Sequence, residues 1–141
     1  MDFAAIRTAI GDLSLEVTGV RKVYPRGADA VAVTPAVVVG MPRADEVIPG
    51  NRQVTNMSIP FELLIERTAD QARDSALLDS YVNLFVAKFA REQSLNDTVV
   101  MAYITEWDSG HFAEYGGATY AGILFTLSVT VHEVMTQALT S

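Results

Sequence analysis

Residues 119–133 read TYAGILFTLSVTVHE and contain the clearest two-residue period of the chain. Four apolar side chains, at Phe125, Leu127, Val129 and Val131, alternate there with threonine, serine and histidine. Such alternation is typical of a β-strand that has one face against a core and the other in solvent. The stretch therefore predicts a long strand in a sheet that is covered on one side.

Four more segments have the character of strands. Residues 56–66 alternate in the same way, and Pro60 places that strand at an edge or leaves one of its sides unpaired at that residue. Residues 36–39 are an uninterrupted apolar run, as in a strand covered on both faces. Two shorter segments, 20–24 and 98–106, complete the predicted strands.

Two segments predict helices. Apolar residues recur at spacings of three and four over residues 3–17, with Asp2 as the expected N-cap and Gly19 in the left-handed C-terminal position. The capping-box pattern Thr68-x-x-Gln71 begins a second helix that runs to about Arg91. Its expected apolar stripe consists of Leu77, Leu78, Tyr81, Leu84, Phe85 and Phe89.

The order α-β-β-β-α-β-β favours an α+β fold, with a single mainly antiparallel sheet and two helices packed on one face. The chain of 141 residues is 50% hydrophobic and shows no linker or repeat, so residues 1–141 are predicted to form one domain. Two connections stand out. Residues 42–53 are rich in proline and charge and predict a long exposed loop or extended arm, and residues 107–118 predict a hairpin with an elaborate tip.

Ten basic against seventeen acidic residues give a net charge of −7, which excludes the basic surface of a nucleic-acid clamp. The charge is uneven: residues 92–141 carry six acids and no lysine or arginine, whereas Arg21, Lys22 and Arg26 cluster near the start. Such a domain can attract a copy of itself head to tail, although chance fluctuation of surface charge explains the asymmetry equally well.

Motifs for chemistry are weak. Asp108, Ser109 and His111 have the residue types of a hydrolytic triad, but neighbouring Asp and Ser more often cap turns. No metal-ligand spacing surrounds His111 or His132, and Gly116-Gly117 lacks the partners of a phosphate loop. The chain has no cysteine and no apolar run long enough for a membrane helix, and its acidic N-terminal residues do not resemble a signal peptide. We therefore expect no catalytic residue, metal or cofactor.

Taken together, several segments resemble the tail terminator proteins of long-tailed bacteriophages, which complete the tail and join it to the head. They are GVRKVYP (19–25), TPAVVV (34–39), the proline- and glycine-rich loop, IPFELLI (59–65) and the helix from Gln71 with LLDSY (77–81). The resemblance implies an α/β sandwich and a structural virion protein. Such proteins form a ring, typically of six subunits, which ends polymerisation of the tail tube and meets the head-side connector.

The resemblance also implies where contacts are made. The loop would supply ring and tube contacts through Arg43, Asp45, Glu46, Val47, Ile48 and Arg52. The hairpin would supply a second contact surface through Trp107, Asp108, His111, Phe112 and Tyr115. DNA would pass through an acidic lumen without specific binding. The expected location is the head–tail junction of the virion, after assembly in the host cytoplasm and without contact to a membrane.

Two other functions stay open at this point. A head-completion (stopper) or minor tail protein would have the same composition. A small cytoplasmic enzyme or ligand-binding domain, with a pocket between sheet and helices, would make use of the Asp108–His111 cluster.

Overall fold

A computed structural model describes residues 1–134 as two helices and one six-stranded sheet. In chain order the elements are α1 (Phe3–Leu15), β1 (Lys22–Tyr24), β2 (Ala36–Val39), β3 (Arg43–Ile48), β4 (Arg52–Glu66), α2 (Gln71–Arg91), β5 (Met101–Tyr115) and β6 (Ala118–Val134). The α+β class is confirmed. The predicted order lacked one strand, β3.

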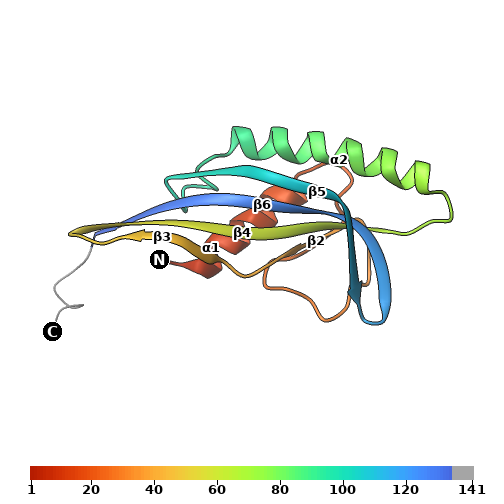
Figure 1. Ribbon diagram of the computed structural model, residues 1–141, viewed down its shortest axis with the longest axis horizontal. Coiled ribbons are helices and arrows are strands. Elements are labelled where there is room, and N and C mark those ends of the chain that lie inside the picture. Colours follow the sequence, from red (N-terminus) through yellow and green to blue (C-terminus); the bar gives the residue numbers. More distant parts are fainter. Residues whose placement is uncertain (135–141) are drawn as a thin grey trace.

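The sheet has the strand order β1-β2-β4-β6-β5, and β3 also pairs with β4, beyond the end of β2. Only β1 and β2 run parallel; all other neighbours are antiparallel. The strands β4, β5 and β6 are long and curved, so the molecule is drawn out along them (Figure 1). The hairpin of β3 and β4 lies at one end of this long axis, and the loop from β4 to α2 lies at the other, near the turn between β5 and β6.

The prediction that Pro60 marks an edge strand is wrong, because β4 lies inside the sheet. Its alternative, a strand with one side unpaired at that residue, is confirmed. The ladder with β2 ends at the pair Val39–Phe61, and the ladder with β3 begins at Arg43–Ser58. Pro60 faces the gap between the two, where its carbonyl oxygen accepts a hydrogen bond from the Gly40 amide at 2.7 Å. A residue without an N–H is tolerated at such a position.

Both helices begin at aspartate caps. Asp2 accepts a hydrogen bond from the Ala5 amide, as predicted. The predicted end of the first helix is wrong, because α1 ends at Leu15 with Glu16 as its C-cap, so Gly19, whose φ is 97°, lies beyond the helix. The capping box predicted at Thr68 is wrong, because Asp70 is the N-cap of α2 and accepts from the Arg73 amide. Asx caps of this kind satisfy a backbone donor that the first helical turn leaves free.

Both helices pack on the same face of the sheet and enclose one apolar core with it. At its centre Phe61, Phe85, Phe89 and Phe125 lie with ring centroids 5.0–6.4 Å apart. The alternating residues of β4 and β6 point into this core as predicted. Two members of the predicted α2 stripe, Leu77 and Leu84, are exposed instead, because the buried side of α2 is centred on Leu78, Phe85 and Phe89.

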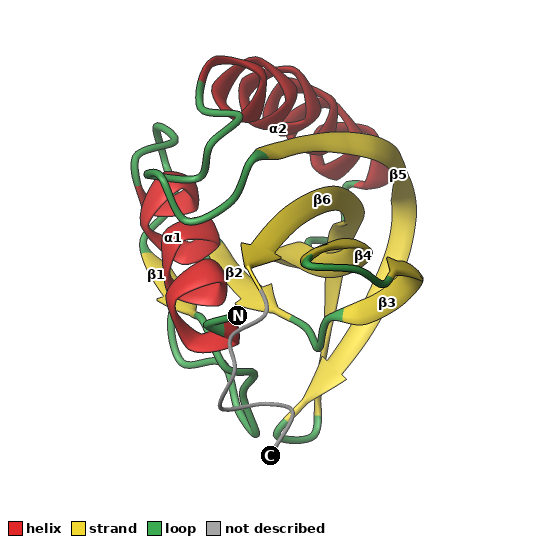
Figure 2. Cartoon of the chain, turned by 90° about the vertical axis from the view of Figure 1, so that its left-hand side faces the viewer, coloured by secondary structure: helices red, strands yellow, loops and turns green. Residues whose placement is uncertain are grey.

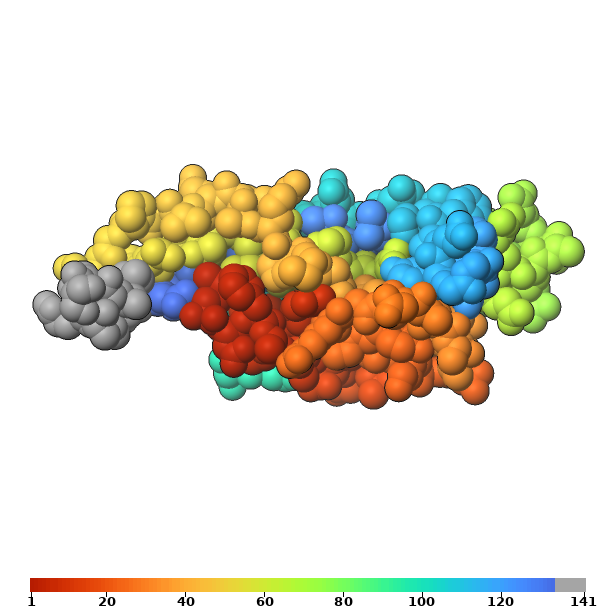
Figure 3. Space-filling view, turned by 90° about the horizontal axis from the view of Figure 1, so that it is seen from below, coloured from red at the N-terminus to blue at the C-terminus, as the bar shows by residue number. Residues whose placement is uncertain are grey.

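A smaller apolar cluster covers part of the opposite face. It contains Val31, Ala36, Val38 and Leu64, and Tyr115 and Tyr120 pack against it. The end of the β5–β6 hairpin curls away from the helices toward this face (Figure 2). There it lies beside the segment that joins β1 to β2 (Figure 3), to which the Tyr120 hydroxyl donates a hydrogen bond at the Val31 carbonyl. The run in β2 is therefore buried on both faces, as predicted.

Candidate interaction surfaces

The segment predicted as a loop, residues 42–53, is part of a β-hairpin. Within it β3 pairs with β4 from Arg43–Ser58 to Ile48–Val54, with a bulge after Ala44. Its sequence has the proline, glycine and charge typical of a loop, but β4 extends past the end of β2 and offers a free edge that β3 occupies. The prediction of exposure is correct, since every residue of β3 is exposed. We call residues 42–53 the arm.

The six predicted contact residues lie along β3 and at the start of β4, and several form local hydrogen bonds. Asp45 accepts hydrogen bonds from Ser58 at 2.5 Å and from Arg43 at 3.2 Å, while Glu46 accepts one from Asn56. These bonds cross-link the arm to β4. Val47 and Ile48 remain about half exposed at its end. The arm therefore presents an apolar tip whose neighbouring acids are already bound.

The elaborate hairpin tip predicted at residues 107–118 is wrong. β5 continues to Tyr115, and only Gly116 and Gly117 form the turn, with φ values of 59° and 82°. Two positive φ angles are those of a type I′ turn, whose twist matches that of the flanking strands. Bulges after Ile104 and Asp108 break the alternation of β5, which explains why its polar half does not show the pattern of a strand.

The outer edge of β5 has no partner strand among residues 1–134. We call Met101–Tyr115 the acidic edge, because the strand carries Glu106, Asp108 and Glu114 and no lysine or arginine. Two aromatic side chains, Trp107 and Phe112, are more than half exposed on it. Phe112 lies under the Arg67 guanidinium, 5.0 Å from it. Long, unprotected edges of this kind are common contact sites.

The triad suggested by residues 108–111 is not assembled. Asp108 accepts a hydrogen bond from the Gly110 amide at 2.9 Å and so caps the bulge, in agreement with the alternative that Asp and Ser here cap a turn. The His111 ring bonds to Glu62, and among the described residues no hydrogen bond joins it to Ser109. His132 is exposed, and no group of metal-ligating side chains forms within residues 1–134.

Instead, the structure brings together Glu62, His111 and Tyr115, a cluster that sequence reasoning did not find. Glu62 Oε2 lies 2.5 Å from His111 Nε2, and the Tyr115 hydroxyl donates to Glu62 Oε1. Burial and the Glu62 carboxylate raise the pKa of the Tyr115 phenol above its ordinary value. Two of the predicted contact residues, His111 and Tyr115, thus point inward and hold the curled hairpin against β4.

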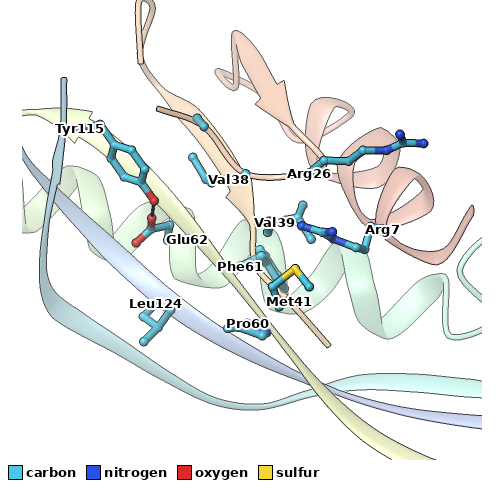
Figure 4. Close-up of a pocket in the computed structure, with 13 residues that line it drawn as sticks. Arg7, Arg26, Val38, Val39, Met41, Pro60, Phe61, Glu62, Tyr115 and Leu124 are labelled. Carbon is cyan, nitrogen blue, oxygen red and sulfur yellow. Dashed lines mark hydrogen bonds between the residues drawn. The ribbon is translucent and has the colours of Figure 1, made fainter. Parts of the chain in front are cut away.

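Beside this cluster lies a groove of about 330 Å³, on the side of the sheet near β2. Its lining is largely apolar and includes Val38, Val39, Met41, Pro60, Phe61 and Leu124. Arg7 from α1 and Arg26 from the loop after β1 occupy one end, and Glu62 and Tyr115 close the other (Figure 4). Neither arginine is a predicted site residue, because only the packing of α1 beside β2 brings the two together.

Among residues 1–134, no carboxylate lies within ion-pairing distance of either arginine of the groove. Arg7 Nη2 donates to the Val39 carbonyl at 3.1 Å, but its Nε is buried and has no partner in the described chain. Burial, together with the positive charge of Arg26, lowers the pKa of Arg7. A buried donor without a partner is rare and costly in a native protein.

Comparison with known proteins gives no family: no family model and no curated protein matches the chain. No helix in the described part of the chain is long and apolar enough to cross a membrane.

Proposed function

We propose that the protein is a structural virion component of a long-tailed bacteriophage, a tail terminator. It forms a ring, of six subunits, at the head-proximal end of the tail tube, ends tube polymerisation there and joins the tail to the head-side connector. DNA passes through the ring without specific binding. The family resemblance of the sequence motivates the proposal, and the fold agrees with the α/β sandwich that this resemblance implies.

One observation carries the assembly part of the proposal. The two sides of the sheet differ in their predominant charge. Arg7, Arg21, Lys22 and Arg26 lie on or beside β1 and β2, with Asp12 beside Arg21 and Lys22, whereas the acidic edge lies across β4 and β6, with Arg67 over its Phe112. Surfaces of opposite charge on opposite sides of one subunit favour a heterologous contact, which closes into a ring when the rotation between subunits allows it.

The native mass of the purified protein tests ring formation. Across a wide concentration range, with and without magnesium, we expect a closed species of about six times 15.3 kDa. Replacing Arg21 and Lys22 with Glu is expected to shift the population toward monomer. Arg73→Glu, at an exposed base on α2, is the matched control and is expected to leave assembly unchanged. A tight dimer, or a ring that both variants leave intact, contradicts the proposed contact.

The place of the ring is tested with particles assembled in the absence of the protein. Loss of a terminator is expected to give tails of abnormal length. Leaking heads with tails of normal length would instead favour the head-stopper hypothesis, which the fold accommodates equally well.

A further inference from the structure

The groove that contains Arg7 and Arg26 combines two features that suit one kind of occupant. Its walls are apolar, and no carboxylate within residues 1–134 pairs with the two guanidinium groups at its basic end. An arginine pair of this kind binds carboxylates. The groove therefore fits a segment in which an exposed apolar side chain stands next to acids.

We propose that this groove binds the acidic edge of a second copy of the chain, with Trp107 against the apolar lining and carboxylates of the same strand on Arg7 and Arg26. The proposal rests on the ring proposed above and specifies the side chains that hold neighbouring subunits of that ring together. In this arrangement the groove of each subunit receives β5 of the next, so the contact is heterologous and repeats around the ring.

The composition of the acidic edge supports this choice of occupant. Trp107 is 52% exposed, and its neighbours in the chain are Glu106 and Asp108. Tryptophan and arginine are the residues that most often dominate the binding energy of protein interfaces. The groove and the acidic edge are also complementary in charge, and two strands, β4 and β6, separate β2 from β5. Within its own subunit the groove is closed at one end by Tyr115, the last residue of the acidic edge, but Trp107 does not line it.

Because the chain has no cysteine, single introduced thiols can report the contact. Met41→Cys places a thiol at the groove, where the side chain is 71% exposed. Ser109→Cys places another on the acidic edge and leaves Trp107 in place. After mild oxidation of a mixture of the two variants, we expect disulfide-linked heterodimers in excess of either homodimer. Leu15→Cys, at an exposed residue of α1, is the matched control for Ser109→Cys and is expected to give no excess of heterodimer with Met41→Cys.

Further substitutions, made in the Met41→Cys and Ser109→Cys chains, then test the ionic and the apolar part of the contact separately. Arg26→Glu in the Met41→Cys chain is expected to slow heterodimer formation about tenfold or more, the factor that corresponds to losing one good ionic contact. Trp107→Ala in the Ser109→Cys chain is expected to have a similar effect. Tyr103→Ala, at a half-exposed aromatic residue of the same strand, is expected to leave the rate unchanged.

The outcomes separate this inference from the proposed ring. A hexameric mass without the specific heterodimer, or with a heterodimer that Arg26→Glu and Trp107→Ala do not weaken, overturns the groove contact and leaves the ring standing. The specific heterodimer without a closed ring upholds the contact and overturns the ring. A chain that forms neither species overturns both.

Discussion

Glu62 and His111 are 49 residues apart in the sequence, yet their side chains meet at 2.5 Å across β6. Glu62 stands between two core residues of β4, and its carboxylate is 12% exposed. A carboxylate in this setting needs strong donors, which the His111 ring and the Tyr115 hydroxyl supply. The polar half of β5 is thus tied to β4 by side-chain bonds in addition to its ladder with β6.

The cluster is expected to stabilise the fold. Tyr115→Phe removes one hydrogen bond to a carboxylate and is expected to lower the free energy of unfolding by about 1–2 kcal/mol. Glu62→Gln alters the same bond, so the double variant is expected to lose less than the sum of the single losses. Urea unfolding measures all three, with Tyr103→Phe as a control on the exposed part of β5. Additive losses would show that the two residues act independently.

A dependence of stability on pH is expected from Asp74. Hydrogen bonds from the Thr68 amide and hydroxyl lower the pKa of this carboxyl in the folded state. A group with a lowered folded pKa stabilises the protein at pH values above the ordinary aspartate pKa of about 3.9. That contribution is lost as the pH falls through the folded pKa.

Asp74→Asn is therefore expected to be less stable than the natural chain at pH 7, with a difference that shrinks toward pH 2.5. Unfolding curves at several pH values measure this difference. Asp79→Asn, at an exposed acid of the same helix, is expected to show no such trend. A gap of constant size at all pH values would mean that Asp74 contributes through its shape and not its charge.

Much of the fold could be predicted because burial leaves a period in the sequence. The alternation at Phe125–Val131 and most of the spacing in residues 3–17 report which side faces the core; Phe3, which is 47% exposed, is the exception. The arm could not be predicted as a strand, because β3 is exposed throughout and has no buried face to give a period. Its pairing depends on the free edge of β4, which is a property of the assembled sheet.

The polar clusters form between residues far apart in sequence, and the strand register that brings them together cannot be predicted from a single sequence. Asp108 is in register with Glu62 through Leu124 of β6, yet the bulge that follows it puts His111 opposite Gly122, and it is the His111 ring that reaches Glu62. The arginine groove likewise needs α1 to lie beside β2, so that Arg7 reaches Val39. Asp108, Ser109 and His111 are close in sequence, but the Asp108 carboxylate bonds the Gly110 amide and the His111 ring bonds Glu62, so the three do not act together.

Gly122 of β6 lies close to the backbone of β4, and a substitution there tests how tightly these two strands pack. A β-carbon at Gly122 would lie 2.4 Å from the Leu63 carbonyl oxygen, so the two strands would have to move apart. Gly122→Ala is expected to cost about 1–3 kcal/mol in urea unfolding, as overpacking does in other cores. At Gly110 the nearest atom is 3.4 Å away, so Gly110→Ala serves as the control and is expected to be nearly neutral.

The arm gives the last prediction, which separates assembly from folding. Val47 and Ile48 are about half exposed, so about half of each side chain packs within the subunit, and replacing both with Ser is expected to cost about 1–3 kcal/mol in urea unfolding. If the arm contacts a neighbour or the tail tube, the same change also places hydroxyl groups where apolar side chains are buried in the assembly. We therefore expect a several-fold weaker self-association in native mass measurements than the control shows at a similar loss of stability. Leu15→Ser with Val100→Ser, at similarly exposed positions off the arm, is the matched control.

The basic residues of the arm extend this test to charge. The double variant Arg43→Glu with Arg52→Glu replaces the two positive charges of the arm with negative ones. Repulsion from the acidic edge of a neighbour is then expected to weaken assembly, and to do so more strongly at low salt than at high salt. Because Arg43 also bonds Asp45, an Arg43→Gln variant shows how much of the effect comes from loosening the arm itself. Assembly that all of these variants leave unchanged would remove the arm from the ring contact and leave β1, β2 and the groove as the basic side of the interface.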